Sequence, residues 1–185
     1  MSDSDSVDVK WNAENMMDNV RSLQRVVQDI EQGSKQSLES DLLLFKGQLL
    51  AGPILLSLAA EIALKALLCW EKNEIPVKTH DLLNLYLSLS ENTRELLEAR
   101  MRKVSPYSIW ADQPGMRNLN SEVQELFHAK MHPLRDVLCS HRDSHTHYRY
   151  LYEKPGGRFE IGEISHALKV IIDVYYEKRR NSAPM

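Results

Sequence analysis

The stretch that decides the fold is ILLSLAAEIALKALLCW at residues 54–70, the most apolar run in the chain. Its apolar side chains recur every three or four residues and cover most of the circumference of a helix. A helix that is apolar nearly all round is usually the central helix of a fold. Glu61 and Lys65 interrupt it four positions apart, the spacing of an ion pair on one helical face. Buried charges are costly without partners, so this pair either orients the helix or supports a functional site.

Weaker helical patterns flank this stretch on both sides. An apolar stripe predicts a helix over residues 14–33, formed by Met16, Val20, Leu23, Val27 and Ile30. A second run begins near residue 42, and Pro53 either kinks it or breaks it. Further helices are expected over residues 79–88 with Thr79 as the cap, 91–103 with Ser90 as the cap, 121 to about 141–145 with a bend at Pro133, and 164–175.

The remaining segments are connections and ends. Residues 104–119 contain two prolines and a glycine and are expected to form a surface loop. Aromatic residues alternate over 148–152, and KPGG at 154–157 favours a turn, so a short β-hairpin is expected near residues 148–161. The sequence therefore predicts an all-α fold with this hairpin as its exception. A single domain over 13–180 would lie between a flexible acidic tail at 1–12 and a tail at 181–185.

The composition is that of an ordinary globular domain. With 185 residues the chain can bury one core without disulfides or a structural metal. Cys69 and Cys139 both fall in expected helices, and MSDSDSVDVK at the N-terminus lacks the apolar run of a secretory signal, so we expect a cytoplasmic protein. A bilayer-spanning version of the apolar stretch would place Glu61 and Lys65 in lipid, so no membrane association is expected. Because the net charge is −3, binding to nucleic acid requires a local basic patch.

The densest group of titratable side chains is CSHRDSHTH at residues 139–147. Cleavage of RNA through its 2′-OH requires a base, an acid and positive charge at the phosphate. A histidine can fill either proton role near neutral pH, and an arginine can grip two phosphate oxygens. Arg142 and His147 are therefore a candidate catalytic pair, the alternative being a solvated, charged helix end. On one continuous helix the two side chains would point about 140° apart, so they converge only if the helix ends between them or if two chains share the site.

A metal site is the competing interpretation of the same histidines. His128 and His132 are four positions apart, and Cys139, His141 and His145 follow them. The glutamate of a zincin motif and a second cysteine pair are both missing, so we expect no metal and no cofactor. Contacts with an RNA backbone are expected from Arg94, Arg100, Arg102, Lys103 and Arg149. The first four also suit an ordinary exposed helix.

Two segments of the chain together resemble a known family. EIALKALL at residues 61–68, followed by PVKTHDL at residues 76–82, resembles a helix and the following "THDL" segment of HEPN-domain proteins. RDSHTH at residues 142–147 is similar to that family's signature, an arginine, a polar residue directly after it and a histidine after four to six intervening positions. The segments stand in the family's order, and the likeness covers about residues 40–180.

The resemblance implies a helical bundle that forms a homodimer and brings two Arg–His motifs into one cleft. It implies a metal-independent endoribonuclease acting on single-stranded RNA, in toxin–antitoxin, phage-defence or RNA-processing settings, with a nucleotidyltransferase-like antitoxin as a candidate partner. Carried over residue by residue, Arg142 would stabilise the scissile phosphate, His147 would transfer protons and Asp143 would assist. His145 is a rival to His147 for proton transfer.

The chain departs from the family pattern at Arg149, where some toxin members carry a tyrosine; tyrosines stand at 148 and 150 instead. Some members of the family also keep the fold without the chemistry. The alternative function is therefore a non-catalytic helical module that binds a nucleotide or a partner protein. A stoichiometric partner, or a nucleotide that is bound without turnover, would favour this alternative.

Overall fold

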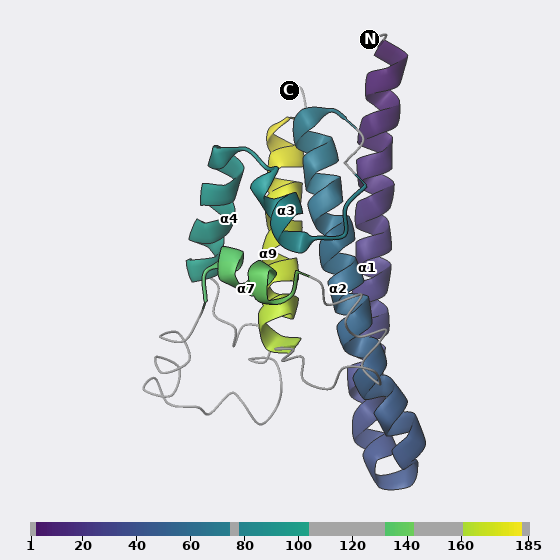
Figure 1. Cartoon of the computed structure of the whole chain (residues 1–185). Coiled ribbons are helices and arrows are strands. Elements are labelled where there is room, and N and C mark those ends of the chain that lie inside the picture. Colours follow the sequence, from purple (N-terminus) through teal and green to yellow (C-terminus); the bar gives the residue numbers. More distant parts are fainter. Residues whose placement is uncertain (1–2, 75–77, 104–131, 143–160, 183–185) are drawn as a thin grey trace.

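The described part of the chain consists of helices (Figure 1). A computed structural model describes residues 3–74, 78–103, 132–142 and 161–182. In chain order its helices are α1 (Asp3–Ser40), α2 (Leu42–Lys72), α3 (Leu82–Leu87), α4 (Glu91–Lys103), α7 (Leu134–Ser140) and α9 (Ile161–Asn181). Within these residues there is no strand, which confirms the all-α prediction. The predicted β-hairpin near 148–161 lies outside the described residues except for Ile161, which begins α9.

α1 and α2 form a long antiparallel hairpin (Figure 1). Asp41 separates the two helices, and its carboxylate accepts hydrogen bonds from the backbone N–H groups of Leu43 and Leu44 at 3.1 and 3.0 Å. This cap satisfies amide groups that have no partner within α2. α2 then continues through Pro53, so the helix break that was one of the two predictions there is wrong.

α1 begins earlier than the sequence pattern predicts. It already includes Asp3, so most of the segment expected to be a tail, residues 1–12, belongs to the helix. The reason is that the buried stripe continues toward the N-terminus through Val9 and Ala13, which join the core formed with α2. The thiol of Cys69 on α2 donates a hydrogen bond to the carbonyl oxygen of Val9 at 3.2 Å, which connects this end of α1 to α2.

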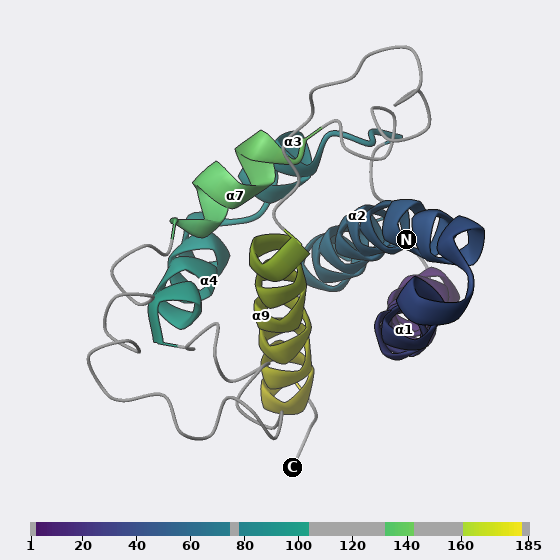
Figure 2. The same cartoon turned by 90° about the horizontal axis from the view of Figure 1, so that it is seen from below.

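α2 is the central helix, as predicted, and packs along α1 on one side and against α9 on the other (Figures 1 and 2). Small side chains on α2 allow close approach of its neighbours, and four are fully buried: Ala59, Ala60, Ala63 and Ala66. Within the described ranges α2 is also the one helix long and apolar enough to cross a membrane. Of that apolar window, 72% is buried inside the fold.

The three short helices α3, α4 and α7 form a group beside α9 (Figure 2). α4 begins after Ser90, whose hydroxyl accepts a hydrogen bond from the N–H of Thr93 at 3.3 Å, so the predicted cap is confirmed. α3 begins after Asp81, so the cap predicted at Thr79 is wrong. α7 begins after Pro133, and residues 132 and 133 lie outside it, so the helix predicted to bend at Pro133 and continue does not pass through this residue.

α9 contains the helix predicted over residues 164–175 and extends it at both ends. The basic residues 178–180 form its last turn, where positive charge suits the helix dipole. The guanidinium of Arg179 lies 2.8 Å from a carboxylate oxygen of Glu14, and that of Arg21 lies 4.6 Å from the ring centre of Tyr176. These contacts join the C-terminal end of α9 to α1.

His166 on α9 gives the fold a pH-dependent stability. Its ring is fully buried, with Nε2 3.5 Å from the carbonyl oxygen of Met101. Nδ1 has no hydrogen-bond partner within the described part of the chain. Burial lowers the pKa of His166 below its ordinary value, and the hydrogen bond to Met101 offsets this effect only in part. The buried ring therefore resists protonation.

We expect the free energy of unfolding to decrease as the pH falls below about 6.5, because the unfolded histidine binds a proton more readily than the folded one. One such group contributes a slope of at most about 1.4 kcal/mol per pH unit. His166→Gln removes the titrating ring, so its urea midpoint should change less than that of the wild type between about pH 7.5 and about pH 5.5. Equal changes in the two proteins would contradict the prediction.

Candidate functional site

Arg142 lies directly after α7 and beside the segment that leads into α3. α7 ends at Ser140 with His141 as its cap, so Arg142 is outside the helix that was predicted to continue to about residues 141–145. The guanidinium Nη2 donates a hydrogen bond to Oδ2 of Asp81 at 2.6 Å. The angle of about 140° between Arg142 and His147, which assumes a continuous helix, therefore does not apply, and it no longer favours a dimer.

Asp81 binds two partners at once. One carboxylate oxygen accepts the backbone N–H of Asn84 at 3.0 Å and caps α3, and the other accepts the hydrogen bond from Arg142. Burial by itself would raise the pKa of Asp81, but the N–H of Asn84 and the guanidinium of Arg142 outweigh it and hold the pKa below its usual value. Asp81 therefore stays ionised and connects the start of α3 to the end of α7.

Glu61 is a buried carboxylate on the apolar helix α2, with 6% of its side chain exposed. Its Oε1 accepts a hydrogen bond from Nζ of Lys65 at 2.6 Å and lies 3.0 Å from Nδ1 of His80. The predicted pair of Glu61 and Lys65 is therefore formed. It is extended by His80, a residue that the sequence analysis did not single out. Because a buried carboxylate needs partners, this contact fixes the segment before α3 against α2.

The two groups of polar contacts meet in the THDL segment. His80 binds Glu61 of α2, and the next residue, Asp81, binds Arg142. The segment is also ordered locally, since the hydroxyl of Thr79 accepts the N–H of Asp81 at 3.2 Å. The sequence feature that could have pointed to His80 is the THDL segment itself, in which the histidine directly precedes an aspartate able to cap a helix. The site thus combines side chains from α2, the start of α3 and the end of α7.

α7 is held in place by a carboxylate of α4. Pro133 provides no side-chain cap, and Glu98 instead accepts hydrogen bonds from the first two backbone N–H groups of α7 at 3.0 and 2.9 Å. Glu98 also accepts a hydrogen bond from the hydroxyl of Tyr86 on α3 at 3.0 Å. Burial, reinforced by the charge of Glu98, raises the pKa of Tyr86 well above its usual value, so the hydroxyl remains a donor. α7 is therefore fixed at both ends.

Several predicted site residues lie outside the described residues. In the segment after Arg142 these are Asp143, His145, His147 and Arg149. His128, a ligand in the alternative metal site, also lies outside. Arg142 is thus the one predicted catalytic residue among the described residues. The supporting pair of Glu61 and Lys65 is also described, and Glu61 contacts His80 of the THDL segment.

The described histidines at the two ends of α7 have separate partners. His141 is buried, and its Nδ1 donates a hydrogen bond to the carbonyl oxygen of Val137 at 2.8 Å. His132 is exposed, and its Nδ1 lies 2.7 Å from Oε1 of Glu163 on α9. In residues 3–74, 78–103, 132–142 and 161–182, no three His, Cys, Asp or Glu side chains are grouped so that they could hold a metal ion.

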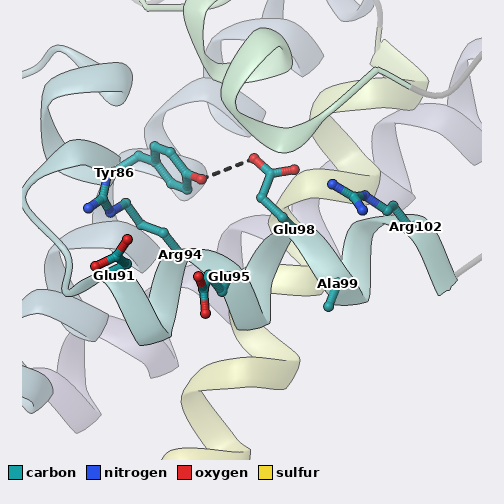
Figure 3. A pocket seen from close by; sticks show the side chains of 7 residues that line it. All are labelled: Tyr86, Glu91, Arg94, Glu95, Glu98, Ala99 and Arg102. Atoms are coloured by element: carbon teal, nitrogen blue, oxygen red, sulfur yellow. Dashed lines mark hydrogen bonds between the residues drawn. The ribbon is translucent and has the colours of Figure 1, made fainter.

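The basic residues of α4 are interleaved with carboxylates. A hollow of about 400 Å3 runs along this helix (Figure 3). It is lined by Tyr86, Glu91, Arg94, Glu95, Glu98, Ala99 and Arg102. Arg100 donates a hydrogen bond to Glu177 of α9 at 2.7 Å, and Lys103 is the last residue of α4. An RNA backbone at this helix would therefore meet carboxylates as well as the predicted arginines.

Asp81→Asn and Asp81→Ala separate the two contacts of this carboxylate. Asparagine caps a helix about as well as aspartate but carries no charge for Arg142, whereas alanine does neither. We expect Asp81→Ala to lower the free energy of unfolding by about 1 kcal/mol more than Asp81→Asn does, since a partly exposed ion pair contributes little. Chemical denaturation measures both values, and a greater loss in Asp81→Asn would contradict the assignment.

Because folding lowers the pKa of Asp81, the stability that its charge provides is present near neutral pH. That contribution is lost as the pH falls below about 4. Both variants should therefore lose less stability than the wild type in this acid range. The same acid dependence in wild type and Asp81→Asn would show that Asp81 carries no such contribution.

A scan against protein-family models, a search of curated proteins and a search of solved structures each found no match to this chain. The resemblance to HEPN-domain proteins therefore stays a prediction.

Proposed function

We propose that this chain is a metal-independent endoribonuclease of the HEPN type that cleaves single-stranded RNA. One observation carries the proposal: Arg142, the first residue of RDSHTH, contacts Asp81 of the THDL segment, 61 positions earlier in the sequence. Arg142 of RDSHTH binds Asp81 of THDL at 2.6 Å, and His80 of THDL lies 3.0 Å from Glu61 of EIALKALL.

The proposed reaction is an internal transesterification of RNA. A base removes the proton of the 2′-OH, the 2′ oxygen attacks phosphorus, and the bond from phosphorus to the 5′ oxygen breaks as an acid protonates that oxygen. The products are a 2′,3′-cyclic phosphate and a 5′-OH end. Arg142 would stabilise the charge that develops on the phosphate. His147 would transfer protons, with Asp143 assisting and His145 as the alternative histidine.

The charges around the site indicate how RNA would bind. Arg142 has 47% of its side chain exposed, so part of it is open to solvent beside its contact with Asp81. The positive charges of Lys65 and Arg142 are balanced by the negative charges of Glu61 and Asp81, and the whole chain has a net charge of −3. Binding should therefore depend on direct contact with the phosphate more than on long-range attraction. Further contacts are proposed for Arg94, Arg100, Arg102, Lys103 and Arg149.

A homodimer is part of the proposal. The connecting end of the α1–α2 hairpin extends beyond the other helices (Figure 1). It exposes five leucines: Leu38, Leu42, Leu43, Leu44 and Leu50. Apolar side chains gathered on a surface often mark an interaction site. A second copy would cover this leucine tip with an identical surface, as in a dimer with two-fold symmetry, and the family resemblance also implies a dimer.

A non-catalytic module is the second candidate function. The observation that favours it is the contact of Arg142 with Asp81 at 2.6 Å, because a bound carboxylate competes with a phosphate for the guanidinium. In this case the contact would serve only to connect α3 to α7, and the chain would bind a nucleotide or a partner protein. A nucleotidyltransferase-like antitoxin in a cytoplasmic setting fits either candidate.

Labelled single-stranded RNA incubated with the purified protein in EDTA tests the proposed nuclease. The wild type should produce 2′,3′-cyclic phosphate ends, and Arg142→Ala and His147→Ala should each lower the rate by about 100-fold or more. Arg135→Ala removes an exposed arginine from the start of α7 and is the matched control, which should cleave as the wild type does. Equal activity in all four preparations would point to a contaminating nuclease and sink the proposal.

Leu43→Lys tests the dimer at the leucine tip. The Leu43 side chain is 81% exposed, so a charge there should leave the protomer's core intact. We expect a larger monomer fraction in sedimentation velocity and lower RNA cleavage per chain, because the charge would be buried in the interface. The control is Val26→Lys, which changes an exposed apolar residue of α1 away from the leucine tip. An unchanged dimer in Leu43→Lys, or a fully active monomer, would overturn this part of the proposal.

A further inference from the structure

We infer that His80 is a second proton-transfer residue of the same site and that buried Glu61 is its positioning residue. The inference rests on the proposed RNA cleavage and adds a residue that lies outside the Arg–His signature. It is carried by one juxtaposition: an exposed imidazole is bonded to a buried carboxylate, and the next residue binds Arg142.

His80 combines exposure with a fixed orientation. Its side chain is 68% exposed, whereas its partner Glu61 is almost completely buried. Nδ1 of His80 lies 3.0 Å from Oε1 of Glu61, and a carboxylate oxygen accepts hydrogen bonds, so Nδ1 carries the hydrogen. In this neutral tautomer Nε2, on the other side of the ring, carries the lone pair. A carboxylate that sets the tautomer and orientation of a histidine in this way recurs in acid–base sites.

The surroundings of His80 suit chemistry at a phosphate. Nζ of Lys65 lies 2.6 Å from the same carboxylate oxygen of Glu61, which adds a positive charge behind the ring. Asp81 follows His80 directly in the chain and binds Arg142 at 2.6 Å. The α-carbons of His80 and Asp81 are about 3.8 Å apart, so the residue that contacts Arg142 is the direct chain neighbour of His80.

His132 shows why the bond to a carboxylate is not sufficient by itself. Its Nδ1 lies 2.7 Å from Glu163, and its side chain is exposed to nearly the same degree as that of His80. His132 precedes α7, however, whereas Arg142 follows the other end of that helix. The chain therefore offers a matched control, a histidine with the same kind of partner that is not next to the Arg142 contact.

Internal cleavage of RNA requires two proton transfers, and His147 supplies one of them in the proposed mechanism. We assign the other to His80. One imidazole accepts the proton of the 2′-OH while the other, in its protonated form, donates a proton to the 5′ oxygen as the bond to phosphorus breaks. Exchange of one proton with water on each ring restores both histidines. Two such groups give a rate that falls on both sides of an optimum pH.

The test is the pH profile of kcat/KM for a labelled RNA, measured on the full chain. We expect two limbs for the wild type, and for His80→Ala a rate lower by about 100-fold or more with one limb lost. His80→Gln keeps a donor for Glu61 but transfers no proton, so it should be as impaired as His80→Ala. Free imidazole should restore part of the activity of His80→Ala and none of that of Arg142→Ala. His132→Ala should match the wild type.

The outcomes separate this inference from the proposed function. Suppose the wild type cleaves RNA and Arg142→Ala does not, while both His80 variants stay within about twofold of the wild type and keep both limbs. The assignment of His80 is then wrong, and the proposed nuclease stands. If no preparation cleaves RNA, both are overturned. Circular dichroism and thermal unfolding verify that each variant is folded, and His80→Gln decides the matter if His80→Ala is not.

Discussion

The candidate site depends on one buried carboxylate, that of Glu61. A charge on the apolar central helix is costly unless it is partnered, and Glu61 finds Lys65 one turn further on α2 and His80 in the segment before α3. The second of these contacts fixes the THDL segment against α2. Asp81, the next residue, caps the start of α3 and binds Arg142. The need of buried Glu61 for partners thus connects the apolar core at α2 to the surface that carries Asp81 and Arg142.

The other half of the site is positioned by the short helix α7. Glu98 of α4 caps its first turn, and the contact of Arg142 with Asp81 fixes the chain just after its last turn. Both contacts involve carboxylates. Glu98 accepts hydrogen bonds from backbone N–H groups at the start of α7, and Asp81 accepts one from the guanidinium that follows its end. Because Arg142 lies outside α7, the residues that follow it are not bound to the angular spacing of a helix. A site within one chain and a site shared by two chains are therefore both compatible with this arrangement.

The predictable parts of the fold were those with strong local signals. The periodicity of residues 54–70 indicated the central helix, and Ser90 with its following residues indicated α4. The start of α3 was predicted wrongly because Thr79 and Asp81 can both cap a helix, and the local sequence does not choose between them. Arg142, Glu61 and Lys65 could be named in advance from patterns in the sequence. The role of His80 depends on its contact with Glu61 of α2, which periodicity does not reveal.

Binding of an RNA phosphate to Arg142 beside the THDL segment can be tested with a crystal structure of the protein bound to a short RNA. This RNA carries a 2′-methoxy group at the cleavage position, which blocks the reaction. We expect the blocked phosphate on the guanidinium of Arg142, with the ring of His80 at hydrogen-bonding distance from the 2′ or the 5′ oxygen. An RNA bound only on another surface, with Arg142 still on Asp81, would contradict it.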